Sequence, residues 1–181
     1  EAPIKVDRKT KRLAKRLTGG EIAVINHIDI DEVAANSLVE GKIKLVINAA
    51  PSISGRYPNK GPGILTDKNI LIIDNVGEEL FNEVKENEII EVVDGKIYRD
   101  GKLIGSGEVL DKNAVKEKIK IAYENLEEEL DRFIDNTIDY AKKFGVYFMK
   151  KLFLVCNAHL DPVWLWQRAE GMAEAMATFR I

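Results

Sequence analysis

The chain has 181 residues, of which 45% are hydrophobic and 31% are charged, and its 27 Lys and Arg nearly balance its 30 Asp and Glu. This composition is typical of a globular protein and excludes collagen-like, disulfide-built and strongly disordered chains. The sequence has no run of about 18 uncharged apolar residues, so it predicts no membrane-spanning helix. The single Cys156 cannot form an internal disulfide. This favours a reducing compartment, and we expect a cytoplasmic protein.

Residues 1–20 are locally basic, with seven Lys or Arg against two acidic residues. The segment is either a docking arm for an acidic partner or nucleic acid, or a solvated helix face with Leu13 and Leu17 packed beneath it. No aromatic residues are interleaved with the charges for base stacking. A nucleic-acid partner is therefore not expected.

Residues 21–110 predict a compact α/β unit with mixed strands. Short apolar runs and periodic segments predict strands at 21–26, 44–49, 70–73, 89–93, 96–98 and 103–104, and helices at 32–40 and 78–85. Asp29 or Asp31 can cap the first of these helices. Two Asp-Gly pairs, at 94–95 and 100–101, lie between apolar runs and predict a meander of hairpins.

A long amphipathic helix is predicted after Asp111 or Asn113, either of which can cap it. Apolar or small residues recur on one face at steps of three and four: Val115, Ile119, Ala122, Leu126, Leu130, Phe133, Thr137 and Ala141. The helix is either a dimerising coiled coil or inter-domain strut, or an element that packs against its own domain. Gly145 is expected to end it.

The segment 48–63 is rich in Gly, Pro and Ser and directly follows a predicted buried strand. Loops in that position often bind ligands in α/β units. We predict an anion site in which two hydroxyls, one amide and two cations contact the ligand: Ser52, Ser54, Gly55, Arg56 and Lys60. The alternative is that the Gly and Pro content only shapes a connection between strands. The segment matches neither a Walker P-loop nor G-x-G-x-x-G.

Three stretches of sequence carry a family resemblance. They are Val-Asp-Arg-Lys-Thr-Lys-Arg-Leu at 6–13, Gly-Glu-Ile-Ala-Val-Ile-Asn-His at 20–27, and Asn-Ala-Ala-Pro-Ser-Ile-Ser-Gly-Arg-Tyr-Pro-Asn at 48–59. With them, residues 5–143 resemble the N-terminal region of the SteA-like proteins, which are associated with the cytokinetic ring and carry a following thiamin-pyrophosphokinase-like domain. The resemblance implies a non-catalytic module that positions this nucleotide-binding domain. That domain does not occur within the 181 residues, so kinase activity is not carried over.

More distantly, the strand order and the Gly/Ser loop resemble the swivelling domain of phosphoenolpyruvate-utilising enzymes. The resemblance implies a compact swivelling-type β/β/α domain over residues 21–110. That family carries its phosphate on a loop histidine, whereas this loop has Ser54, Gly55 and Arg56, which argues against phosphohistidine transfer. His27 either lines the same cleft or is a structural hydrogen-bonding group.

A second chemical motif is His159-x-Asp161. On an extended strand the imidazole and the carboxylate face the same side and can converge on one zinc ion; the alternative is that the pair is structural. Its surroundings, Val-Cys-Asn-Ala-His-Leu-Asp-Pro-Val-Trp-Leu-Trp-Gln at 155–167, make residues 149–181 similar to the N-terminus of family 38 glycoside hydrolases, the zinc-dependent retaining α-mannosidases. The resemblance implies that His159 and Asp161 are zinc ligands and that Trp164 lies near the sugar subsite. A retaining glycosidase needs two carboxylates roughly 5–5.5 Å apart, which in that family lie far downstream. We expect no activity from this segment alone.

The predicted organisation is a basic arm or helix at 1–20, the α/β domain at 21–110, the long helix at 111–145, and a truncated glycosidase segment at 149–181 that forms a strand and a helix. The two resemblances meet near residues 144–149, and the last residues stop within a helix-like pattern. We therefore expect a chimera or fragment without activity as an isolated chain. The expected partners are cell-division proteins, by resemblance, and a second copy through the 113–143 helix.

Overall fold

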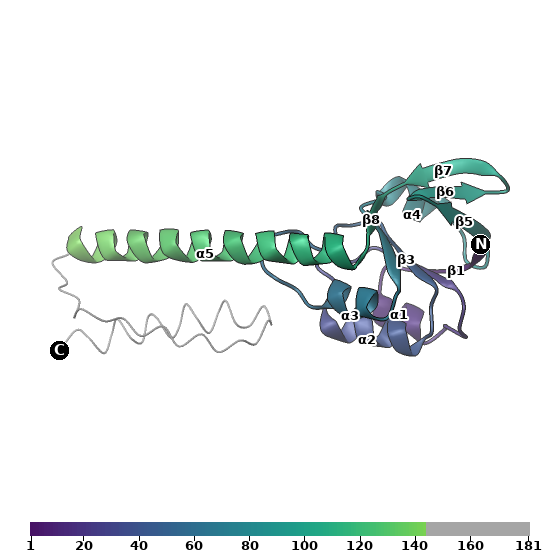
Figure 1. Cartoon of the computed structure of the whole chain (residues 1–181), viewed down its shortest axis with the longest axis horizontal. Coiled ribbons are helices and arrows are strands. Elements are labelled where there is room, and N and C mark those ends of the chain that lie inside the picture. Colours follow the sequence, from purple (N-terminus) through teal and green to yellow (C-terminus); the bar gives the residue numbers. More distant parts are fainter. Residues whose placement is uncertain (144–181) are drawn as a thin grey trace. The chain divides into compact units, whose positions relative to one another are not determined.

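The computed structural model describes residues 1–143 (Figure 1). The chain divides into two compact units, residues 1–136 and 137–181. In chain order the elements are β1 (Ala2–Asp7), α1 (Thr10–Ala14), β2 (Ile22–Ile25), α2 (Glu32–Glu40), β3 (Leu45–Asn48), α3 (Gly61–Asp67), β4 (Leu71–Asp74), α4 (Glu78–Glu83), β5 (Ile89–Val93), β6 (Lys96–Arg99), β7 (Lys102–Ser106), β8 (Glu108–Leu110) and α5 (Lys112–Lys143). The described residues form an α/β fold whose last element is a long helix, which confirms the general α/β class. Gly145 and the strand and helix predicted at 149–181 lie outside the described residues.

One mixed sheet organises the first unit. Its strand order is β7-β6-β5-β1-β2-β3-β4-β8, in which β1 to β4 are parallel and β5 to β8 are paired antiparallel. Each parallel crossover contains one helix, and α1, α2 and α3 gather on one side of the sheet (Figure 1). Successive crossovers between adjacent strands place their helices on the same side because such crossovers share one hand.

The alternating residues of the strands build two cores, one on each side of the sheet. Ala23 and Ile25 of β2 lie in the helix-side core, together with buried residues of α1, α2 and α3. Ile22 and Val24 lie in the meander-side core, which is completed by α4 and by buried residues of β5 and β6. Because successive side chains on a strand point to opposite faces, this four-residue strand can be buried on both sides.

The two ends of the sheet are joined through a single residue. β7 and β8 are the outermost strands, yet only Gly107 separates them in sequence. Its backbone amide donates to the Gly95 carbonyl oxygen at 2.9 Å, so the β5–β6–β7 meander folds back towards β8. A Cβ at position 107 would lie 2.5 Å from the Asp74 carbonyl oxygen, which explains the glycine.

Several predicted elements are confirmed and three were not predicted. Helix α2 and strand β5 have the predicted bounds, and both Asp-Gly pairs adopt positive φ angles at their turns. The predictions lacked β1, α3 and β8. The segment 1–20, expected to be a basic arm or helix, contains β1, which pairs with β2 on one side and β5 on the other. Strand β1 was missed because residues 1–20 were interpreted by their positive charge, although Ala2, Ile4 and Val6 alternate with polar residues and Pro3 as in a strand.

Helix α5 begins as predicted after Asp111, whose Oδ1 accepts hydrogen bonds from the amides of Asn113 and Ala114. Its first turns pack on the domain, since Val115 is part of the helix-side core and Ala122 has no exposed surface. Further along, Leu126 and Leu130 are half-buried. None of the helices in residues 1–143 is long and apolar enough to cross a membrane.

Candidate functional site

Buried polar side chains gather where the parallel strands end. Asp7 ends β1, Asn48 ends β3 and Asp74 ends β4, and each of them is buried. This edge is where open α/β sheets bind ligands. The connection from β3 to α3, which contains the predicted anion-binding residues, begins at this edge.

Asn48 joins the ends of two strands. Its Oδ1 accepts a hydrogen bond from the His27 amide at 3.0 Å, and its Nδ2 donates to the His27 carbonyl oxygen at 2.8 Å. The same Nδ2 donates to the Ser52 hydroxyl oxygen at 2.8 Å. Because Asn48 has no exposed surface, these contacts satisfy an amide that would otherwise be costly to bury.

Asp74 holds the first serine of the loop. Its Oδ1 accepts hydrogen bonds from the Ser52 amide at 2.9 Å and from the Ser52 hydroxyl at 2.6 Å, and Ser52 is fully buried. Burial raises the pKa of Asp74, and the two bonds from Ser52 oppose that effect. Across the sheet Asp74 is paired with Glu108 of β8.

Asp29 holds the second serine in the same way. Its two carboxylate oxygens accept from the Ser54 amide at 2.7 Å and from the Ser54 hydroxyl at 2.8 Å. Tyr57 lies near the same carboxylate, since burial and then the Asp29 charge raise the pKa of its phenol. Residues 51–60 are therefore fixed by two carboxylates, and we call them the anchored loop.

The far end of the anchored loop is fastened to the start of α2. Asn59 Nδ2 donates to the carbonyl oxygens of Ile30 and Ser52 at 2.9 and 2.8 Å. Gly61, which follows, passes so close to the α2 entry that a Cβ there would overlap the carbonyl oxygens of Ile30 and Asp31. These contacts define the position of the loop without any ligand.

All five residues predicted to bind an anion lie on the anchored loop. They differ in whether their polar groups already have a partner within the domain. The hydroxyls of Ser52 and Ser54 donate to Asp74 and Asp29. The Gly55 carbonyl oxygen accepts from Asn125 Nδ2 of α5 at 2.9 Å. Arg56 and Lys60 are exposed, and within residues 1–143 neither forms an ion pair.

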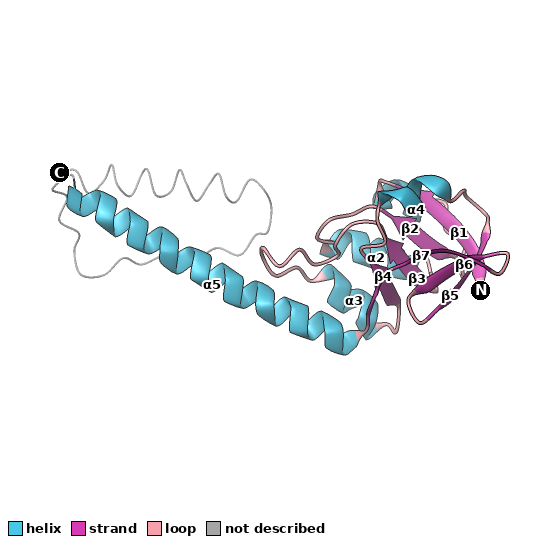
Figure 2. Cartoon of the chain, turned by 90° about the horizontal axis from the view of Figure 1, so that it is seen from above, coloured by secondary structure: helices cyan, strands magenta, loops and turns pink. Residues whose placement is uncertain are grey.

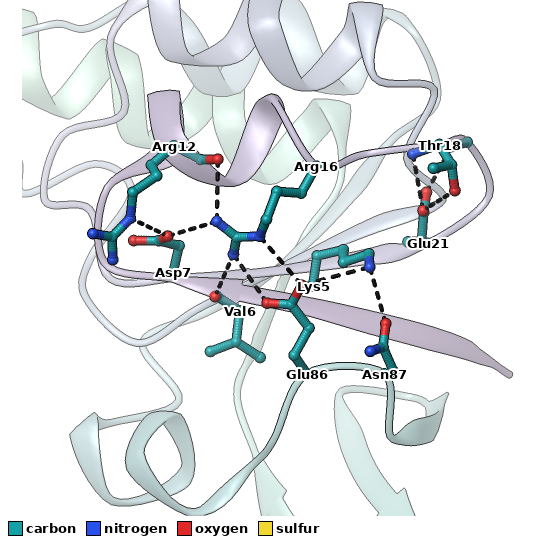
Figure 3. A network of polar contacts seen from close by, with 10 residues as sticks. Lys5, Val6, Asp7, Arg12, Arg16, Thr18, Glu21, Glu86 and Asn87 are labelled. Atoms are coloured by element: carbon teal, nitrogen blue, oxygen red, sulfur yellow. Dashed lines mark hydrogen bonds and ion pairs between the residues drawn. The ribbon is translucent and has the colours of Figure 1, made fainter.

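Three arginines of the basic N-terminal segment form contacts inside the domain. Figure 3 shows two of them, Arg12 and Arg16. Arg12 Nε lies 2.6 Å and Arg16 Nη1 2.9 Å from Asp7 Oδ2, and Arg16 also pairs with Glu86 at 3.0 Å. Arg8 pairs with Glu78 at 2.9 Å. The Arg12 hydrogen bond in particular holds the pKa of Asp7 far below its usual range. These arginines connect α1 and the residues beside it to the end of β1, to α4 and to the turn between α4 and β5. This favours the structural interpretation over a docking arm.

His27 has a structural environment. Its Nδ1 lies 2.9 Å from the hydroxyl oxygen of Thr10, which is buried, and its backbone is held by Asn48 on both sides. Its Nε2 lies 3.9 Å from the Asp31 carboxylate. Of the two interpretations, the geometry supports a hydrogen-bonding residue that links α1 to the end of β2.

The most important contacts of the loop were not predicted from the sequence. Asp29 was considered only as a helix cap, and Asp74 and Asn125 were not singled out. Asp74 could have been found, because a carboxylate that follows an apolar run at the carboxyl end of a buried strand is a recurrent site residue. Asn125 carries no such signal, since it lies among the charged residues of a long helix.

The predicted zinc ligands His159 and Asp161, and Trp164, lie outside the described residues. Within residues 1–143 there is no group of three or more His, Cys, Asp or Glu side chains placed to hold a metal ion. Searches of protein-family models, of curated proteins and of solved structures find no match to this chain.

Proposed function

We propose that residues 1–136 form a non-catalytic, swivelling-type module that binds an anionic group through Arg56 and Lys60 and positions a neighbouring domain. One observation carries the proposal: the anchored loop is held by two carboxylates while its own two cations have no ion-pair partner within the described part of the chain. Of the five other arginines in residues 1–136, four pair with carboxylates, namely Arg8, Arg12, Arg16 and Arg99, and the fifth is Arg132 of α5. Arg56 is thus available to a ligand.

The chemistry of the loop fits an anion with two or more oxygens. A guanidinium can donate two parallel hydrogen bonds to such a group, and the Lys60 ammonium on the same loop would add a second charge. In this proposal the serine hydroxyls do not contact the ligand. They place the loop, because each is used together with its own amide to bind a carboxylate. A loop that is ordered before binding loses less entropy when the ligand arrives.

The swivelling-type assignment is supported by the arrangement of the domain. Three helices cover one face of the sheet, and a short helix with an antiparallel meander covers the other. Helix α5 then leads away in sequence towards the second unit, as expected for a module that positions a neighbour. The link to cell division comes from the resemblance to SteA-like proteins and is part of the same proposal.

We also propose that α5 mediates self-association. Leu126 and Leu130 continue the apolar face of the helix, are only half-buried and belong to neither core of the domain. Apolar residues repeated at steps of three and four along one face are the pattern by which two helices pair. A second copy of the chain would bury them.

Isothermal titration calorimetry with inorganic pyrophosphate tests the anion site. We expect the wild-type chain to bind, and Arg56→Ala to weaken binding by about tenfold or more, because a charge-assisted hydrogen bond contributes roughly 1.5–3 kcal/mol. Lys68→Ala is the matched control, since it removes an exposed positive charge just beyond α3. Equal affinities for the two variants would contradict the proposal.

A further inference from the structure

We propose that the anchored loop is coupled to α5, so that an anion held by the loop changes how firmly the helix is seated on the domain. This inference rests on the anion site proposed above and adds its regulation. Two separate connections between the loop and the helix carry it. One is direct, and the other passes through the edge of the sheet.

The direct connection is the hydrogen bond from Asn125 Nδ2 to the Gly55 carbonyl oxygen, at 2.9 Å and across 70 residues of sequence. Gly55 has a φ of +80° and immediately precedes Arg56. The connection between β3 and α3 runs alongside α5 in both views (Figures 1 and 2). The backbone that presents the Arg56 side chain is therefore tied to the helix.

The indirect connection passes from α5 through two strands. Lys118 Nζ lies 2.9 Å from Glu108 Oε2 of β8, and Glu108 is paired across the sheet with Asp74 of β4. Asp74 is the carboxylate that binds the amide and hydroxyl of Ser52. Burial and the two Ser52 bonds have the largest effects on the pKa of Asp74, and smaller, opposite effects come from Lys118, which lowers it, and Glu108, which raises it. Both members of the salt bridge therefore lie within electrostatic reach of the group that holds the loop.

Both connections use the same face of the helix. Lys118 and Asn125 are seven residues apart, which is close to two turns, so they lie on one face. Ala122 lies between them on that face and has no exposed surface. After Asn125 the apolar positions Leu126 and Leu130 are only half-buried. Asn125 thus lies where the seated part of the helix ends.

Coupling of this kind acts in both directions. If the Asn125 contact is stronger when the loop holds an anion, the anion favours the seated helix, and the seated helix raises the affinity for the anion by the same factor. Helix α5 continues to Lys143, past the end of the first unit at Asn136. An event at Arg56 is thereby passed to the element that leads into the second unit.

The coupling itself is tested without ligand, by amide hydrogen exchange on the full chain. Asn125→Ala should speed exchange of loop amides 53–57 by roughly two- to tenfold, the effect of losing one exposed hydrogen bond. Asn136→Ala, an exposed asparagine on the same helix, is the control and should leave the loop unchanged. Amides of β2 report on global unfolding and should not respond to either variant. Loop exchange that is equal in the two variants would overturn the proposal.

A second arm adds inorganic pyrophosphate and separates the coupling from the anion site. In the wild type we expect slower exchange both in the loop and at residues 118–126. In Asn125→Ala we expect slower exchange in the loop and a weaker response of the helix, because only the connection through Lys118 and Glu108 remains. Slowing of the loop without any response of the helix in the wild type would refute the coupling and leave the anion site standing. If pyrophosphate affects neither, the anion site is refuted, and the ligand-free comparison still decides the coupling.

Discussion

Replacement of Asp74 tests whether the anchored loop depends on a buried hydrogen-bond acceptor or on a buried charge. Asp74→Ala removes the acceptor of two bonds and leaves the Ser52 amide and hydroxyl without it in a buried environment. Each unsatisfied buried group costs about 1–3 kcal/mol, so for the two groups we expect a loss of roughly 2–6 kcal/mol in the free energy of unfolding. Asp74→Asn keeps an oxygen that can accept both bonds. It should stay within about 1 kcal/mol of the wild type at pH 7.

The pH dependence gives a second readout of the same variants. Burial raises the pKa of Asp74 in the folded chain, so protonation of Asp74 stabilises the fold. This contribution to the free energy of unfolding is complete below the ordinary Asp pKa of about 3.9 and is lost as pH rises through the raised pKa. Asp74→Asn cannot ionise and should lack this loss. Urea denaturation followed by circular dichroism between pH 4 and 8 measures both effects. If Asp74→Asn is as destabilising as Asp74→Ala at pH 7, the charge and not the acceptor holds the loop, and our reasoning is wrong.

Three further changes test the fold and the assembly. Gly61→Ala should destabilise the chain by about 2 kcal/mol or more because its Cβ would overlap backbone oxygens. Gly63→Ala, in open space on the same helix, is the control and should be neutral or stabilising. Thermal unfolding compares the two variants, and equal midpoint temperatures would contradict the close approach at Gly61. Asp7→Asn should cost about 1–3 kcal/mol at pH 7 in urea denaturation, relative to the exposed control Asp100→Asn. Since the pKa of Asp7 is lowered in the fold, the free-energy cost of Asp7→Asn should be full above the ordinary Asp pKa and should shrink as pH falls towards the lowered pKa. A cost that stays the same at acidic pH would exclude the ion pairs as its source. Leu126→Asp should convert a dimer to a monomer in light scattering, and a wild-type chain that is already monomeric at high concentration would remove the self-association proposal.

The sequence predicted best those elements whose signals are local. Helix α2 has the predicted bounds because Asp31 caps its first turn, accepting from the Ala34 amide at 2.7 Å. The meander was predicted because Asp-Gly pairs readily adopt the positive φ angles that tight turns need. Helix α3 was missed because it begins Gly61-Pro62-Gly63, a composition typical of loops, and it forms against the entry of α2.

The candidate site was predicted in position but not in its contacts. Segment 48–63 stood out because Gly, Pro and Ser follow an apolar strand, and the structure places it at the carboxyl edge of the sheet. The partners of its serines, Asp29 and Asp74, lie 25 and 22 residues away. No periodicity links such positions, because the pairing depends on which strands become neighbours. Likewise, the sequence could not show that Arg56 lacks a carboxylate partner within the described residues, because that depends on which charged side chains the fold brings together.

The central claim is that Arg56 and Lys60 on a pre-ordered loop bind an anion. Titration of the isotope-labelled full chain with inorganic pyrophosphate, followed by two-dimensional NMR, tests it most directly because it reports on each residue separately. The account predicts saturable shifts confined to amides 53–60 and the neighbouring turns of α5, and their loss in Arg56→Ala. Shifts centred elsewhere, or shifts that persist unchanged in Arg56→Ala, would contradict it.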